Sequence, residues 1–145
     1  MESDTFYLTR FHSLIGMISP SDVFTGDPVV VSISPLKTTF CLRTAPSNAG
    51  DVDGDGHADL IVGAWQYAGA AVSGGRAYLY SGKDGHLLKT FTCRTPGDTF
   101  GFDSVSMGDI DHDGTMDFLI TSAWSAVHRF HSGRMFIVSS GIRKR

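Results

Sequence analysis

The chain contains two matching stretches, Gly50-Asp51-Val52-Asp53-Gly54-Asp55-Gly56-His57-Ala58-Asp59-Leu60-Ile61-Val62 and Gly108-Asp109-Ile110-Asp111-His112-Asp113-Gly114-Thr115-Met116-Asp117-Phe118-Leu119-Ile120. The offset between them is 58 residues, counted from Asp51 to Asp109. The similarity continues past both stretches, because Ala64-Trp65 recurs as Ala123-Trp124 and Gly75–Gly82 recurs as Gly133–Gly141. The chain is therefore built from an internal repeat rather than from one short motif used twice.

The composition indicates that this repeat is made of β-strands. The chain has 145 residues, 41% of them hydrophobic and 19% charged, which is typical of a globular domain. Its 17 glycines and 10 phenylalanines favour short strands joined by tight turns over a helical bundle. A strand-built period of about 40–60 residues is typical of propeller blades, which bury their sheet faces only against neighbouring units.

Strands are predicted at matching places in both units. Those of the first unit are Asp59–Ala64, Arg76–Ser81 and, after a turn at residues 82–85, His86–Cys93; those of the second are Phe102–Met107, Asp117–Ser122 and Arg134–Ser139. We therefore predict an all-β, partial β-propeller of about two four-stranded antiparallel blades. The first blade covers residues 41–96 and has a degenerate opening strand, and the second covers residues 97–145 and lacks its last strand.

The first 40 residues do not fit the repeat. Val29–Ile33 has the composition of a strand, but Pro20, Pro28 and Pro35 divide this region into short pieces. We expect residues 1–40 to be disordered or to supply a single strand.

The two acidic loops have the composition of a calcium site. Each places aspartates at relative positions 1, 3, 5 and 9, with a backbone carbonyl available at position 7 and a glycine at position 6 that lets the chain turn. Calcium takes six to eight oxygen ligands, whereas magnesium resists such complete dehydration. We predict about two Ca²⁺ ions per chain. The predicted ligands are Asp51, Asp53, Asp55, the His57 carbonyl and Asp59 in the first loop, and Asp109, Asp111, Asp113, the Thr115 carbonyl and Asp117 in the second.

Two other kinds of loop have a similar composition. An EF-hand begins in the same way but requires a glutamate at position 12 between two helices, where this chain has Val62 and Ile120 in apolar runs typical of buried strands. Solvated turns are also rich in Asp and Gly. However, four like charges within nine residues repel one another, and the same pattern at matched places in both units favours a bound cation.

Charge and cysteine content exclude several classes of function. The net charge is −3, and eight of the 15 acidic residues lie in the two loops. The basic end Arg143-Lys144-Arg145 is typical of a solvated tail, so we expect no nucleic acid partner. Cys41 and Cys93 form neither a disulfide framework nor a zinc-ligand spacing. No stretch approaches the roughly 20 apolar residues of a membrane span, and Glu2 and Asp4 argue against a secretory signal before the apolar run at residues 14–18.

These features resemble the FG-GAP repeat family, which forms the propeller blades of integrin α-subunits and of many bacterial surface and secreted proteins. The resemblance covers about residues 48–141. The second unit has the family's opening Phe100-Gly101 and an altered closing motif, Ser122-Ala123-Trp124; the first closes with Gly63-Ala64-Trp65 and lacks the opening pair. The resemblance implies a calcium ion between the two innermost strands of each blade. It also implies further blades from a longer parent chain, because such propellers usually close with about seven.

We expect from this resemblance a non-enzymatic interaction or adhesion module at the cell surface or outside the cell, with a protein or glycan ligand. Two alternatives remain. Similar repeats accompany the catalytic domains of some secreted hydrolases and lyases, but the pair His128 and His131 has no nucleophile or metal-ligand spacing beside it. Trp65, Tyr67 and Trp124 follow the inner strands and could instead stack on a carbohydrate.

Overall fold

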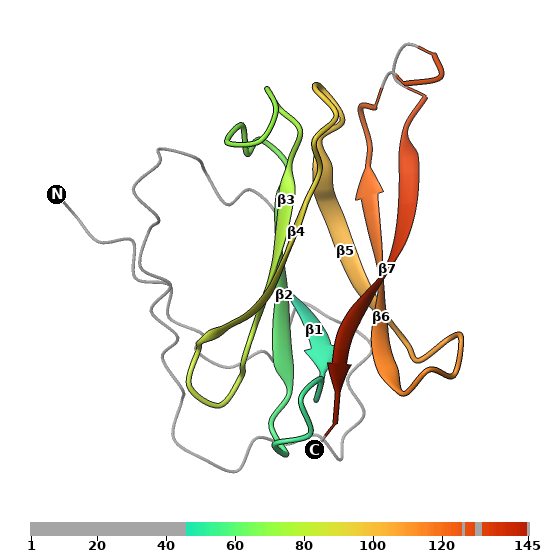
Figure 1. Ribbon diagram of the computed structural model, residues 1–145. Helices are drawn as coiled ribbons and strands as arrows, with labels where there is room; N and C mark the ends of the chain where they lie inside the picture. The colour runs from blue at the N-terminus through green and yellow to red at the C-terminus, as the bar shows by residue number, and fades with distance from the viewer. Residues whose placement is uncertain (1–45, 126, 130–131, 145) are drawn as a thin grey trace, which may run out of the picture.

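The computed structural model describes residues 46–125, 127–129 and 132–144, and in them the chain forms two antiparallel sheets (Figure 1). The first sheet has the strand order β1-β2-β3-β4 and the second β5-β6-β7. The strands are β1 (Ser47–Gly50), β2 (Asp59–Ala64), β3 (Arg76–Tyr80), β4 (Leu87–Thr92), β5 (Phe100–Gly108), β6 (Thr115–Ser122) and β7 (Arg134–Arg143). The predicted all-β fold is confirmed, and the described residues form one antiparallel sheet of four strands and one of three.

The predicted strands are found, with differences at their ends. The largest concerns β7, which continues to Arg143 although the sequence predicted an end at Ser139. Ser139-Ser140-Gly141 is composed like a turn, but the Ser140 hydroxyl accepts the backbone N–H of Met116 in β6 at 3.2 Å. This bond holds the two strands together across a bulge, and pairing resumes between Thr115 and Arg143. The predicted strand Val29–Ile33 lies outside the described residues.

A hydrophobic core fills the space between the two sheets. Ile61 and Leu79 lie opposite each other on β2 and β3, and Phe118 and Ile120 lie on β6; all four side chains are fully buried. Phe118 and Ile120 are two residues apart, so the pleat of β6 directs both side chains to the same face. Full burial of one such side chain stabilises the fold by about 1.5–3 kcal/mol.

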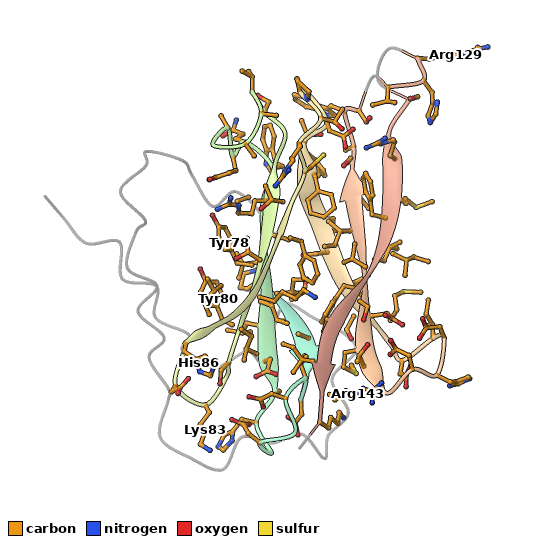
Figure 2. All side chains as sticks on the ribbon, in the orientation of Figure 1. Tyr78, Tyr80, Lys83, His86, Arg129 and Arg143 are labelled. Atoms are coloured by element: carbon orange, nitrogen blue, oxygen red, sulfur yellow. The ribbon has the colours of Figure 1, made fainter. Side chains whose placement is uncertain are left out.

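The first sheet has a second apolar cluster on its other face. Val62, Tyr78 and Tyr80 are buried there with Ala64, and Figure 2 shows both tyrosines pointing away from strands β5–β7. In the 58-residue register Tyr78 and Tyr80 correspond to Phe136 and Val138, which face the first sheet from β7. One face of the repeat unit is thus apolar in both copies.

The Phe100-Gly101 pair forms the junction between the sheets. Phe100 makes a parallel bridge with Gly75 and packs edge-on against Phe136, with ring centroids 5.1 Å apart. Gly101 has a φ of 85°, and a Cβ at this position would overlap the carbonyl oxygen of Arg76. Only glycine fits this combination of backbone conformation and close approach.

In the part of the chain that the structure describes, no helix is long and apolar enough to cross a membrane.

Candidate metal sites

The two acidic loops occupy equivalent places in the two sheets. Residues 51–58 connect β1 to β2, and residues 109–114 connect β5 to β6. Both loops lie at the lower end of the molecule in Figure 1. Val62 and Ile120, at loop position 12, lie within β2 and β6. This position was predicted to lie in a strand, whereas an EF-hand has a glutamate of a helix there.

Three carboxylates converge in each loop. One oxygen each from Asp51, Asp53 and Asp59 lies within 4.8 Å of the others. The same holds for Asp109, Asp111 and Asp117 in the second loop. Among the described residues, these are the two groups of three or more His, Cys, Asp or Glu side chains close enough together to hold a metal ion. They correspond to loop positions 1, 3 and 9.

The aspartate at position 9 anchors each triad to the sheet. Asp59 is fully buried, and its two carboxylate oxygens accept the backbone N–H groups of Val52 at 2.8 Å and Gly82 at 3.0 Å. Asp117 is almost fully buried and accepts the N–H of Ile110 at 3.0 Å. Asp59 is the first residue of β2 and Asp117 is the third residue of β6. Burial and these hydrogen bonds therefore fix the positions of both carboxylates.

The electrostatic environment of Asp59 favours a cation. Burial raises the pKa of its carboxyl, and the negative charges of Asp53 and Asp55 raise it further, against the hydrogen bonds from Gly82 and Val52 that lower it. The groups of the protein therefore stabilise the charged carboxylate of Asp59 less well than water does. A bound divalent cation would supply the missing positive charge.

The aspartate at position 1 shapes the turn of each loop. Asp51 accepts the backbone N–H groups of Gly54, Asp55 and Gly56 at 2.8–3.1 Å. Asp109 accepts those of Asp113 and Gly114, both at 3.0 Å. The glycine at position 6 has a φ of 86° in both loops, so the backbone needs glycine there, as the sequence predicted.

The aspartate at position 5 lies outside the triads and bonds to position 7 instead. Asp55 Oδ1 accepts the N–H of His57 at 2.9 Å, and the His57 ring Nδ1 lies 3.2 Å from the same oxygen. Asp113 Oδ1 accepts both the hydroxyl and the N–H of Thr115, which lower the pKa of Asp113. Metal ligation by Asp55, Asp113 and the carbonyls of His57 and Thr115 stays a prediction.

The donor sets fit a hard divalent cation. Each triad offers only carboxylate oxygens, which suit magnesium, calcium and manganese rather than the softer metals that prefer sulfur or imidazole ligands. In each triad two carboxylates come from the loop and one from the strand that follows it, Asp59 in β2 or Asp117 in β6. A bound ion would therefore connect loop to sheet. Holding a cation is thus the chemistry that this arrangement supports.

One buried ion pair was not predicted from the sequence. Asp98 is fully buried in the connection between the sheets, and its Oδ2 lies 2.7 Å from Nη2 of Arg134 at the start of β7. Burial alone would raise the pKa of Asp98, but the nearby Ser125 hydroxyl, the hydrogen bonds from Cys93 and Arg134 and the charge of Arg134 together lower it. The equivalent position in the 58-residue register is Phe40, so the repeat gave no signal for this pair.

The aromatic residues considered for carbohydrate binding divide into two groups. Trp65 and Trp124 are neighbours, with ring centroids 5.6 Å apart, and Phe102 of β5 lies 5.9 Å from Trp65. Tyr67 is separate from them and stacks under the guanidinium of Arg76, 3.7 Å from its ring centroid. Of the two histidines before β7, His128 is exposed and His131 lies outside the described residues.

Comparison with known proteins agrees with this geometry. The family model of the FG-GAP-like repeat matches residues 51–120, which include both acidic loops. Integrin alpha-7 from rat and from mouse is 31% identical to this chain over 113 residues, which are 75% of the chain. The chain spans only 9% of the length of either integrin. The protein therefore contains an FG-GAP-like repeat region that is distantly similar to integrin alpha-7.

Proposed function

We propose that this chain is a non-catalytic, calcium-stabilised interaction module that works at the cell surface or outside the cell. The observation that carries the proposal is the pair of aspartate triads, each anchored by a buried carboxylate at the start of an inner strand. The triads connect loop to sheet, so a bound ion would brace the loop rather than act on a substrate. The ligand-binding surface would then be elsewhere on the units.

Calcium is the cation that best suits these loops. Each triad contributes three carboxylates, and Asp55 or Asp113 with the carbonyl at position 7 would raise the number of oxygen ligands toward six. Magnesium would keep several waters and would not need so many protein oxygens. Extracellular calcium is millimolar, which is sufficient to fill sites of modest affinity, and the similarity to integrin alpha-7 supports a location at the cell surface.

Isothermal titration of the metal-free chain with calcium tests this proposal. We expect about two ions per chain, with Asp53→Asn and Asp111→Asn each removing one site and the double variant removing both. Calcium at 100 times its Kd should stabilise the fold by about 2.7 kcal/mol per site in urea denaturation. A folded chain that takes up no calcium, or the same heat from magnesium at equal concentration, would contradict the assignment.

The adhesive role itself needs a ligand-binding measurement. If the ions brace the loops, binding of a protein or glycan ligand to the full chain should weaken when calcium is removed, in proportion to the loss of stability. A panel of extracellular matrix proteins and glycans, screened with and without EDTA, provides the readout. If ligand binding needs calcium but survives in both Asp53→Asn and Asp111→Asn, one calcium-loaded loop of either unit is sufficient for binding.

A glycan-binding surface at the tryptophans is a second candidate. Trp124 is 52% exposed beside Trp65 and Phe102, and flat exposed rings of this kind stack on the apolar faces of sugars. A glycan array with Trp124→Ala and Trp65→Ala variants tests it. Loss of a glycan signal in Trp124→Ala with unchanged calcium binding would support this surface, and unchanged glycan binding in both variants would reject it.

A further inference from the structure

The buried ion pair between Asp98 and Arg134 is joined through one atom of each side chain. Oδ2 of Asp98 lies 2.7 Å from Nη2 of Arg134 and also accepts a hydrogen bond from the Cys93 thiol at 3.2 Å. The other carboxylate oxygen, Oδ1, and the Nε of Arg134 are buried too, and neither makes a hydrogen bond in the part of the chain that the structure describes. Because a side-on pair would use both of these groups, this ion pair is incompletely hydrogen-bonded.

Two buried serine hydroxyls lie beside the pair. Ser122 ends β6 opposite Arg134, and the pleat of the strand directs its side chain to the same inner face as Ile120. The Ser125 hydroxyl is close to the Asp98 carboxyl, although the two groups do not meet with hydrogen-bond geometry. Both serines are fully buried, and no described residue forms a hydrogen bond with either hydroxyl.

The four unpaired atoms therefore gather at one place, which we call the junction cluster. Among the described residues, the buried side-chain nitrogen and oxygen atoms that lack a hydrogen bond are Asp98 Oδ1, Ser122 Oγ, Ser125 Oγ and Arg134 Nε. Buried polar atoms are nearly always hydrogen-bonded, either to protein or to ordered water. Four exceptions within a single cluster indicate a shared partner.

The backbone beside Asp98 holds its carboxylate in place. The N–H of Thr99 donates to the carbonyl oxygen of Ser73 at 2.9 Å. Thr99 has a φ of 57°, which β-branched residues rarely adopt. Its hydroxyl donates to the carbonyl oxygen of Asp98 at 2.6 Å and accepts the N–H of Trp124 at 3.2 Å. The position of Asp98 is thus set by the junction between the sheets rather than by the pairing of its own carboxylate.

The hydrogen-bonding character of the junction cluster selects the partner. Asp98 Oδ1 only accepts hydrogen bonds, Arg134 Nε–H only donates, and the two hydroxyls can do either. The guanidinium would repel a metal cation, and the carboxylate would repel an anion. A small neutral molecule that both donates and accepts suits all four atoms. Water does so, since a buried water typically makes about three hydrogen bonds to polar groups that have no other partner.

We propose that the junction cluster binds one internal water molecule. The water donates to Asp98 Oδ1 and accepts from Arg134 Nε–H, and the hydroxyls of Ser122 and Ser125 complete its hydrogen bonds. It bridges the two halves of the ion pair that do not meet directly, and so connects the segment between the sheets to β6 and β7. The inference is independent of calcium binding, because none of these four residues belongs to an aspartate triad.

Water-selective NMR of the full chain, labelled with ¹⁵N at the arginine Nε atoms, tests this proposal. A cross-peak between water and the Arg134 Nε–H is expected, with opposite signs in the NOE and ROE spectra, because a bound water tumbles with the protein. Arg94 and Arg129 are exposed and should give only exchange peaks, which have the same sign in both spectra. A same-sign peak at Arg134, or no peak, would overturn the proposal.

Two serine variants locate the water. Ser122→Val replaces a hydroxyl of the junction cluster with apolar groups that fill its space, and should remove the Arg134 cross-peak. Ser106→Val makes the same change on β5, outside the cluster, and should leave the peak unaltered. A peak of full intensity in Ser122→Val would contradict the proposed position.

A crystal structure of the unaltered chain gives the answer even if Ser122→Val does not fold. We expect a water oxygen within about 3.2 Å of both Asp98 Oδ1 and Arg134 Nε. A direct hydrogen bond from Ser125 to Oδ1, with no water between the two halves of the ion pair, would equally overturn the proposal.

Discussion

Arg76 and Arg134 occupy the same position in the two repeat units, yet they make different contacts. Arg76 stacks on the ring of Tyr67 and donates from Nε to the Thr92 hydroxyl at 2.9 Å. Arg134 forms an ion pair with the buried carboxylate of Asp98. The first arginine is held by its own unit, whereas the second connects its unit to the chain segment that joins the sheets.

The acidic loops differ in the same way. In the first loop the anchoring carboxylate of Asp59 reaches the β3–β4 turn through the N–H of Gly82. In the second loop the attachment runs through Thr115, whose hydroxyl lies 2.6 Å from that of Ser139 on β7. Equal sequence patterns therefore give equal loop shapes, while the neighbours that stabilise each loop depend on the unit. Four sets of substitutions test these differences.

The largest effect is expected for Asp59→Ala, compared with Asp117→Ala. Removing Asp59 leaves two backbone N–H groups, those of Val52 and Gly82, without an acceptor, at about 2 kcal/mol each. Removing Asp117 leaves the N–H of Ile110 without its acceptor. In EDTA, urea denaturation followed by tryptophan fluorescence should show a free energy of unfolding lowered by about 4 kcal/mol in Asp59→Ala and by about 2 kcal/mol in Asp117→Ala. Equal losses would mean that the loops are anchored alike.

Arg134→Met should come next, compared with Arg76→Met. Removing Arg134 leaves the buried charge of Asp98 without its partner, which costs about 3 kcal/mol. Removing Arg76 loses a stacking contact of about 1 kcal/mol or less. Thermal and urea denaturation of both variants measure the difference, and a larger loss for Arg76→Met would contradict the contrast between the units.

The same ion pair predicts a pH dependence. The folded-state pKa of Asp98 lies below its ordinary value of 3.8, so its stabilising contribution is complete above that pH and is lost as pH falls through the lower folded value. The stability gap between the wild type and Arg134→Met should therefore be constant near neutral pH and narrow as the pH falls into the acid range, because protonation of Asp98 removes the charge that Arg134 stabilises. A gap that widens on acidification would exclude a charged Asp98.

Gly101→Ala should have a smaller effect, measured against Gly108→Ala on the same strand. Both glycines have a positive φ, which costs about 1 kcal/mol for alanine. At Gly108 a Cβ has no neighbour within 4 Å, whereas at Gly101 it overlaps the backbone of Arg76. We expect Gly108→Ala to lower the free energy of unfolding by about 1 kcal/mol. Gly101→Ala should lower it by about 2–3 kcal/mol, because the added methyl group must push β5 away from β3 at the junction between the sheets. Similar losses would show that β5 can shift freely.

The smallest effect is expected for Lys83→Met. Lys83 Nζ lies 3.9 Å from Asp55 Oδ2 and is largely exposed, at the same end of the molecule as the first loop (Figure 2). Removing this competing positive charge should increase the calcium affinity of the first loop by less than about fivefold, which is at most about 1 kcal/mol. Calorimetry on the Asp111→Asn background isolates that site, and a decrease in affinity would contradict the electrostatic argument.

The repeat pattern predicted much of this arrangement from particular residues. β2 was predicted with its observed ends, because Leu60-Ile61-Val62 is an apolar run between an aspartate loop and a turn. The close positions of Asp51, Asp53 and Asp59 follow from their spacing around glycines at which the chain turns. The extension of β7 to Arg143 was missed, because Ser139-Ser140-Gly141 has turn composition and pairs only with the help of side chains on β6.

By itself, the sequence determined the strand-based repeat, the two acidic loops and the oxygen donors in them, because alternation, turn chemistry and loop spacing are local properties of the chain. Only the tertiary structure decided which side chains from distant parts of the chain meet. The Asp98–Arg134 pair and the Trp65–Trp124 contact each join residues far apart in sequence. Their formation depends on how the two sheets pack, and no local pattern encodes that packing.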